Sequence, residues 1–143
     1  MLEKNLLKGK KTIITGASYG IGKSLAIGFA DLGSEVGILS RSEDKLKNVV
    51  NEIKEKGHSA FYEKADVSNY DDVKNAIDNL IKKMGKIDVF INNAGVARVK
   101  EFDKLKLHQI ELIIDVNLKG PLFCSHIILP HFIKNNGGVI INT

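Results

Sequence analysis

The sequence has one cysteine, two prolines and no tryptophan. Cys124 therefore cannot form an internal disulfide, and its apolar neighbours Leu122, Phe123 and Ile127 favour a small buried side chain over a nucleophile. No apolar run approaches the roughly 18 residues of a membrane span, and the N-terminus lacks the layout of a signal peptide. We expect a cytoplasmic protein without membrane contact.

Nucleic acid and metal ions are not expected as ligands either. The formal net charge is +4, but Arg41 and Arg98 are the only arginines among 21 basic residues, and the lysines are scattered without interleaved aromatic residues. The basic charge therefore indicates a solvated surface. The histidines show no metal-ligand spacing with carboxylates or with Cys124; they are His58, His108, His126 and His131.

The chain has 143 residues, 43% of them apolar and 27% charged, which fits one globular domain over residues 1–143. Short apolar runs alternate with longer segments of helical period, and this pattern is typical of an α/β protein. Short, mostly apolar strands suit a parallel sheet covered by helices on both faces. We predict a Rossmann-type doubly wound sheet of order 3-2-1-4-5. The five predicted strands are 11–15, 36–39, 60–62, 87–91 and 139–142.

Three helices are predicted between the first four strands. They end at Gly33, Gly57 and Gly85, because glycine is a natural C-cap, and the third begins with a capping-box pattern, Ser68-x-x-Asp71. The expected buried stripes are Ile21, Leu25, Phe29 and Leu32 in the first helix, Leu46, Val49, Val50 and Ile53 in the second, and Val73, Ala76, Ile77, Leu80, Ile81 and Met84 in the third. From residue 105 to 132 we expect two helical pieces, because Asn117, Gly120 and Pro121 interrupt the pattern.

The first strand runs directly into a glycine-rich turn, Thr15-Gly16-Ala17-Ser18-Tyr19-Gly20-Ile21-Gly22. A dinucleotide pyrophosphate needs backbone N–H groups at a helix N-terminus and no Cβ in its way. Gly16 would then make the tight turn, Gly20 would admit the phosphates and Gly22 would let helix and sheet pack closely. Ser18, Tyr19 and Ile21 would line the loop. Taken alone, the motif is equally typical of any tight connection between a strand and a helix.

A second motif, Ile91-Asn92-Asn93-Ala94-Gly95, follows the fourth strand. With the glycine turn at its correct spacing, the sequence resembles the short-chain dehydrogenase/reductase family over essentially all of its 143 residues. The resemblance implies a nicotinamide dinucleotide cofactor. It also implies that the Asn-Asn-Ala-Gly turn braces the centre of the sheet. Contacts with the adenosine part of the cofactor are implied for Asp66, Val67, Asn93, Ala94 and Gly95.

Three features of the sequence also have a plain structural interpretation. Asp66 fits a loop carboxylate ahead of a Ser68 cap, and Asn92-Asn93 fits ordinary turn chemistry. Asn117 fits a side chain that interrupts a helix and bonds a nearby carbonyl. Its family counterpart does something similar while holding a water in the proton relay, so the resemblance implies a catalytic position for Asn117.

The end of the second strand predicts which cofactor is bound. An acidic residue about 20 positions after the glycines would bind the ribose 2′-hydroxyl of NAD. The chain instead reads Leu39-Ser40-Arg41-Ser42, so no carboxylate repels a 2′-phosphate. Arg41 offers a fork of donors to a phosphate, and the Ser40 and Ser42 hydroxyls are further donors. We therefore predict NADP(H), with NAD(H) less favoured; the alternative is that Arg41 is a surface charge and Ser42 a helix cap.

The chain departs from the family at its C-terminal end. Family members carry a serine after the fifth strand and then a Tyr-x-x-x-Lys motif, and the sequence stops at Thr143, so we expect a C-terminally truncated domain. Tyr19-x-x-x-Lys23 and Tyr70-x-x-x-Lys74 match the motif formally, but they lie in the glycine loop and the third helix. Loss of a general acid removes a factor of about 10²–10⁴ in rate. The chain alone should be a poor enzyme or none.

The sequence thus supports an NADP(H)-dependent oxidoreductase that reduces a ketone or oxidises an alcohol, represented here by its cofactor-binding half. The resemblance is closest to the branch of 3-oxoacyl-carrier-protein reductases, and the implied partners are the dinucleotide and a small carbonyl or hydroxyl substrate. The alternatives are a catalytically inactive nucleotide-binding or partner-binding module and a fragment without function. An apolar strand at 139–141 on the sheet edge also predicts self-association.

Overall fold

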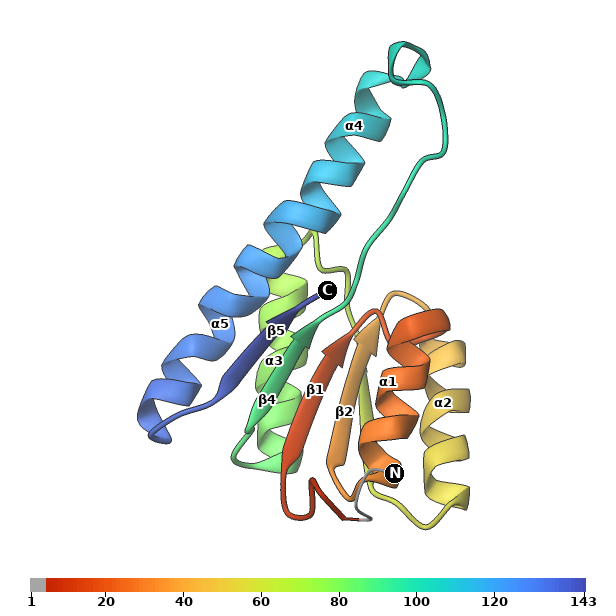
Figure 1. The fold of residues 1–143 in the computed structure, drawn as a ribbon. Helices are drawn as coiled ribbons and strands as arrows, with labels where there is room; N and C mark the ends of the chain where they lie inside the picture. The colour runs from red at the N-terminus through yellow and green to blue at the C-terminus, as the bar shows by residue number, and fades with distance from the viewer. Residues whose placement is uncertain (1–4) are drawn as a thin grey trace.

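The computed structural model describes residues 5–143 and contains one parallel five-stranded sheet (Figure 1). The strand order is β3-β2-β1-β4-β5, as predicted. The fourth strand begins and ends later than the predicted 87–91, and the N–H of Ile87 donates to the Nε2 atom of His131 instead (3.0 Å). The strands are β1 (Lys11–Thr15), β2 (Glu35–Ser40), β3 (Ala60–Lys64), β4 (Val89–Asn92) and β5 (Val139–Asn142).

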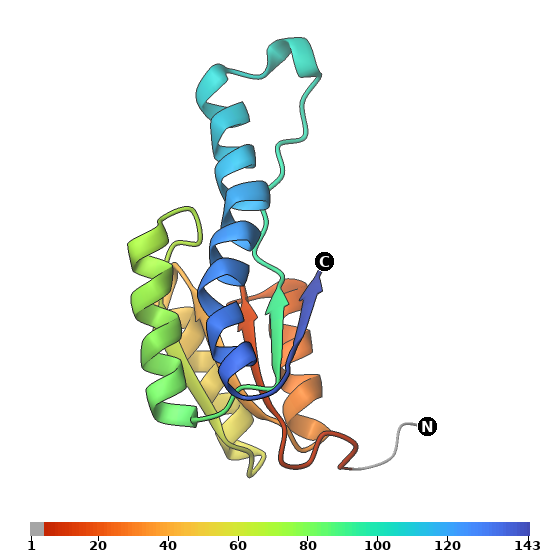
Figure 2. The same ribbon diagram turned by 90° about the vertical axis from the view of Figure 1, so that its left-hand side faces the viewer.

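Helices cover both faces of the sheet, which confirms the doubly wound architecture. Helices α1 (Gly20–Asp31) and α2 (Glu43–Glu55) pack on one face, and α3 (Tyr70–Met84) and α5 (Gly120–Lys134) pack on the other (Figures 1 and 2). Each face has its own core of fully buried side chains, with Ile14 and Ile38 in the first and Ile13 and Phe90 in the second. The two cores hold the carboxyl ends of the central strands in fixed positions.

The buried stripe of α1 differs from the predicted one. Gly22, Ala26 and Ala30 are its buried residues, whereas Ile21 is 71% exposed and the other predicted positions are partly buried. Small side chains at i, i+4 and i+8 allow α1 to lie close to the sheet, and the larger side chains then flank the contact. The prediction favoured large apolar residues and was therefore shifted by one position.

The N-cap of helix α3 lies one residue later than predicted. Asn69 is the N-cap, and its side chain accepts a hydrogen bond from the N–H of Asp72 (3.0 Å). The predicted cap, Ser68, donates its hydroxyl to the Oδ1 atom of Asp66 instead (2.7 Å). The predicted end at Gly85 is confirmed, and the φ angle of this residue is +80°.

Residues 107–134 form one continuous helix rather than the two predicted pieces. Helix α4 (Leu107–Ile114) passes through a π-helical turn, η2 (Asp115–Lys119), into α5. The wider π-helical turn accommodates Asn117, and the helix continues into α5 at Gly120 without a break. With the short helix η1 (Phe102–Lys104), α4 extends beyond the sheet (Figures 1 and 2).

The stretch Leu107–Lys134 is long and apolar enough to be a candidate membrane span. Core helices of soluble proteins meet the same two criteria. Four residues of this stretch are buried in the core that α3 and α5 share with the sheet: Val116, Cys124, Ile128 and Phe132. These contacts assign its α5 portion to the packing of the domain.

Strand β5 lies at one edge of the sheet and pairs with β4 in parallel. Val139 and Ile141 are 53% and 39% exposed on this strand. Self-association through this edge stays a prediction.

Candidate functional site

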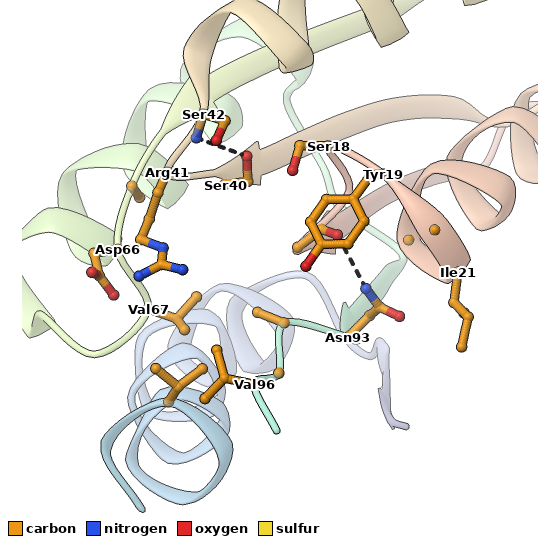
Figure 3. A pocket seen from close by; sticks show the side chains of 17 residues that line it. Ser18, Tyr19, Ile21, Ser40, Arg41, Ser42, Asp66, Val67, Asn93 and Val96 are labelled. Atoms are coloured by element: carbon orange, nitrogen blue, oxygen red, sulfur yellow. Dashed lines mark hydrogen bonds between the residues drawn. The ribbon is translucent and has the colours of Figure 1, made fainter. Parts of the chain in front are cut away.

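A cavity of about 400 Å³ opens at the carboxyl ends of β1, β2 and β4, where the strand order of the sheet changes direction (Figure 3). Ligands of open α/β sheets bind at this switch point. All fourteen residues predicted to bind the cofactor line this one cavity, and their role as ligands stays a prediction. They are Gly16, Ser18, Tyr19, Gly20, Ile21, Gly22, Ser40, Arg41, Ser42, Asp66, Val67, Asn93, Ala94 and Gly95.

The three glycines of the first turn have different surroundings. A Cβ atom on Gly16 would lie 2.6 Å from the Cα of Ala94, and one on Gly22 would lie 2.4 Å from the carbonyl oxygen of Gly16 and 2.5 Å from the Nδ2 atom of Asn93. Gly20 has a φ of +57° and nothing within 4 Å of its Cβ position. Gly16 and Gly22 therefore let the loops approach each other, while Gly20 leaves open space at the N-terminus of α1. That open space fits the pyrophosphate of a dinucleotide.

Thr15 joins the two sequence motifs. Its hydroxyl oxygen accepts hydrogen bonds from the N–H groups of Asn93 (3.0 Å) and Ala94 (2.9 Å). The Asn93 side chain returns to the first loop and donates its Nδ2 to the carbonyl oxygens of Thr15 (3.0 Å) and Gly16 (3.3 Å). Thr15 is 1% exposed, and sequence reasoning assigned it no role.

Asn92 braces the adjoining strands from a buried position. Its Nδ2 atom donates to the Oδ1 atom of Asn142 on β5 (2.8 Å) and to the hydroxyl of Ser125 on α5 (3.3 Å). Thr143 donates its N–H to the carbonyl oxygen of Asn92 (3.1 Å). The bracing of the sheet by this turn, which the family resemblance implied, is present in the structure.

Ser40, Arg41 and Ser42 form the wall of the cavity at the end of β2. Figure 3 shows the Arg41 guanidinium directed into the cavity on the side of Asp66 and Val67. Ser42 is the N-cap residue of α2, as the alternative interpretation predicted, although its side chain makes no capping hydrogen bond. The hydroxyl of Ser40 accepts the N–H of Ser42 (3.3 Å).

The opposite wall combines a carboxylate with apolar side chains. Asp66 accepts two hydrogen bonds from Ser68 on its Oδ1 atom, from the N–H at 3.0 Å and from the hydroxyl at 2.7 Å. This pairing fixes the carboxylate at the cavity edge next to the buried Val67. Sequence reasoning missed three apolar residues of the lining, which no motif marks: Ala65, Val96 and Val116.

Two of the predicted loop residues lie at the rim of the cavity. Tyr19 and Ile21 are 68% and 71% exposed. Tyr19 is the N-cap residue of α1 in extended conformation, and its ring lies beneath the ammonium group of Lys45, 5.5 Å from the ring centre. Both side chains therefore face solvent as well as the cavity.

Asn117 lies outside this cavity, in the π-helical turn η2. Its side chain pairs with the backbone of Val96: Nδ2 donates to the carbonyl oxygen and Oδ1 accepts the N–H, each at 2.8 Å. It also lines a neighbouring cavity with Asn92, Asn142 and Thr143. The bond to a carbonyl is present as that interpretation had it, but Asn117 does not interrupt the helix, which continues through η2. The catalytic position stays a prediction.

The two formal Tyr-x-x-x-Lys matches are engaged elsewhere. The hydroxyl of Tyr70 hydrogen-bonds the Nδ1 atom of His126 (3.0 Å), and Lys74 pairs with Asp78 (2.6 Å). Lys23 pairs with Glu52 (2.8 Å). These contacts place both lysines in surface ion pairs. They support the exclusion of both Tyr-x-x-x-Lys matches as the catalytic motif.

Cys124 is buried, as predicted, and burial raises the pKa of its thiol to about 12. A thiol with such a pKa is not a nucleophile at neutral pH. Within residues 5–143, the His, Cys, Asp and Glu side chains form no group of three or more suited to a metal ion.

Comparison with known proteins gives consistent matches. Residues 10–143 match the family model of the short chain dehydrogenases. The 3-oxoacyl-acyl-carrier-protein reductase FabG of Staphylococcus epidermidis is 37% identical over 134 residues, which are 93% of this chain and 55% of the relative. An uncharacterized oxidoreductase of Thermotoga maritima is 36% identical over 137 residues, 96% of this chain and 54% of the relative.

Solved structures give the same result. A short-chain type dehydrogenase/reductase from Mycobacterium marinum has a TM-score of 0.91 at 33% identity, covering 95% of this chain and 56% of that protein. A gluconate 5-dehydrogenase from Burkholderia cenocepacia, solved with NADP and tartrate, has a TM-score of 0.89 at 32% identity, covering 95% and 53%. The chain thus spans about half the length of the relatives it matches.

Proposed function

Because this chain belongs to the short-chain dehydrogenase family, we propose that it is the cofactor-binding half of an NADP(H)-dependent oxidoreductase that interconverts a ketone and an alcohol. When bound, the dinucleotide supplies or accepts the hydride. The residues of this chain bind and orient it. A small carbonyl or hydroxyl substrate and a cytoplasmic location belong to the same proposal, and the resemblance to 3-oxoacyl-carrier-protein reductases supports the substrate class.

The single observation that carries the cofactor assignment is the position of Arg41. The guanidinium enters the cavity beside the end of β2, where the ribose of a dinucleotide lies in this fold. The wall from Ser40 to Ser42 holds two hydroxyls and no carboxylate, so it favours a 2′-phosphate over a 2′-hydroxyl. Two similar structures, the gluconate 5-dehydrogenase and a metagenomic short-chain oxidoreductase, were solved with NADP.

The test is the ratio of the dissociation constants for NADPH and NADH in wild type and in Arg41→Ala. We expect wild type to prefer NADPH by about ten- to a hundredfold, and the variant to lose most of that preference. Arg98→Ala is the matched control, because it removes the other arginine from an exposed segment outside the cavity. A wild type without preference, or an Arg41→Ala variant that keeps it, contradicts the assignment.

One observation favours the second candidate, a module that binds nucleotide without turnover. All the residues predicted to bind the cofactor line one cavity of this chain. Carbonyl-dependent oxidation of NADPH distinguishes the two candidates. Turnover by this chain alone would contradict the module, whereas tight NADPH binding without turnover supports it.

A further inference from the structure

The first turns of α2 carry two lysines whose charges have different surroundings. Lys47 forms an ion pair with Glu43 (3.0 Å), and this contact lowers the pKa of the Glu43 carboxyl and raises that of the Lys47 ammonium. The Glu43 charge is therefore already compensated within the helix. Lys45 and Arg41 take part in none of the ion pairs found within residues 5–143.

The ammonium group of Lys45 lies instead over the ring of Tyr19, 5.5 Å from its centre. The negative face of an aromatic ring attracts a cation without using its hydrogen-bond donors, so all three N–H donors of the ammonium remain available to a ligand. Tyr19 lines the cavity from the glycine loop. The contact thus holds a cation that comes from α2 next to the loop that follows β1.

Lys45 itself does not line the cavity; its contact with Tyr19 places its charge at the rim, on a second side of the ribose site. Arg41 enters the cavity on the side of Asp66 and Val67, whereas Lys45 is held on the side of the glycine loop. The end of β2, with Ser40 and Ser42, lies between these two sides. A doubly charged phosphate on the ribose there would lie between two cations, and its negative charge would attract both.

We propose that Lys45, positioned by the ring of Tyr19, is a second cation for the 2′-phosphate of NADP(H) and a determinant of cofactor specificity. The assignment rests on the proposed function, since NAD(H) has no 2′-phosphate to which Lys45 could bind. Lys45 would bind as a point charge, whereas Arg41 offers a planar fork.

The test uses two probes that differ only in the phosphate concerned, adenosine 2′,5′-bisphosphate and adenosine 5′-monophosphate. Their dissociation constants are measured by calorimetry for wild type, Lys45→Met, Arg41→Met and Lys54→Met. Lys54→Met is the matched control, because it removes the same charge from the same helix nine residues, about 13 Å, further along the axis. Methionine preserves an unbranched apolar stem, and Lys45 is exposed, so the fold should be retained.

We expect Lys45→Met to bind the 2′,5′-bisphosphate about tenfold more weakly, with the affinity for the monophosphate changed by less than about twofold. Lys54→Met should leave both affinities within about twofold of wild type. An unchanged bisphosphate affinity in Lys45→Met, or an equal loss for both probes, overturns the assignment.

The controls separate this inference from the proposal on which it rests. If wild type binds both probes equally, the NADP(H) proposal fails and the role of Lys45 fails with it. If wild type discriminates and Arg41→Met loses the discrimination while Lys45→Met keeps it, only the role of Lys45 fails.

Discussion

The hydroxyl oxygen of Thr15 lies 2.9 Å from the backbone nitrogen of Ala94 and accepts its hydrogen bond. The same oxygen accepts the N–H of Asn93, so one buried side chain at the end of β1 holds the loop that follows β4. The two sequence motifs that line the cavity are therefore one structural unit, and damage to either loop should affect both.

Replacement of Thr15 by valine tests this unit. Thr15→Val preserves the shape of the side chain but leaves two partly buried N–H groups without an acceptor, so we expect a loss of about 2–4 kcal/mol in the free energy of unfolding. Urea denaturation measures it. Thr15→Ser keeps the hydroxyl and should lose less than half as much. Equal losses in the two variants would show that the methyl group, not the hydrogen bonds, stabilises this position.

Gly22 and Gly28 form a matched pair on α1. Gly22→Ala places a Cβ atom 2.4 Å from the carbonyl oxygen of Gly16, so we expect a destabilisation of about 1–3 kcal/mol and weaker dinucleotide binding. Gly28→Ala meets nothing within 4 Å and should stabilise the helix by up to about 1 kcal/mol. Thermal melting and NADPH titration of both variants test the pair. A Gly22→Ala variant that binds NADPH like wild type would contradict the close approach of the two loops.

Asn117 should anchor the segment that leads from β4 to α4. Asn117→Ala removes both hydrogen bonds to Val96, and we expect hydrogen exchange at the Val96 amide to accelerate by about tenfold. Asn117→Asp keeps the acceptor for that amide and loses the donor, so its acceleration should be smaller. Exchange measured by mass spectrometry reports both. Unchanged exchange in Asn117→Ala would mean that the pairing does not restrain the segment.

His131 should make stability depend on pH. Its Nε2 atom accepts the N–H of Ile87, which requires a neutral ring, and burial, with a smaller effect of Lys134, lowers the pKa of His131 below the ordinary 6.5. The unfolded chain therefore binds more protons between the lowered pKa and 6.5, so stability falls as pH drops through this range and levels off below it. Urea denaturation from pH 5 to 8 should show this slope in wild type. A slope unchanged in His131→Gln would exclude His131 as its source.

The strand order and the composition of the cavity could be predicted because both depend on local signals. Short apolar runs separated by helical segments predict the sheet, and motifs that follow β1, β2, β3 and β4 must meet at one edge of a parallel sheet. The fourteen residues predicted to bind the cofactor line one cavity for this reason.

Features that depend on contacts distant in sequence were not predictable. The buried stripe of α1 is set by its close approach to the sheet, which selects Ala26 and Ala30 over Ile21. The π-helical turn accommodates Asn117, whose partner, Val96, lies 21 residues earlier. The start of α3 was mispredicted for a local reason instead: the Ser68 hydroxyl donates to the Asp66 carboxylate, and Asn69 is the N-cap residue. Local patterns do not show which of two neighbouring polar residues has another partner.

The most direct test of the central claim is a crystal structure of the chain with NADP⁺. We expect the pyrophosphate over Gly20 at the N-terminus of α1, the adenine next to Asp66 and Val67, and the 2′-phosphate within hydrogen-bond distance of the Arg41 guanidinium. A cofactor bound in another cavity, or a 2′-phosphate directed to solvent away from Arg41, would contradict the assigned cofactor site.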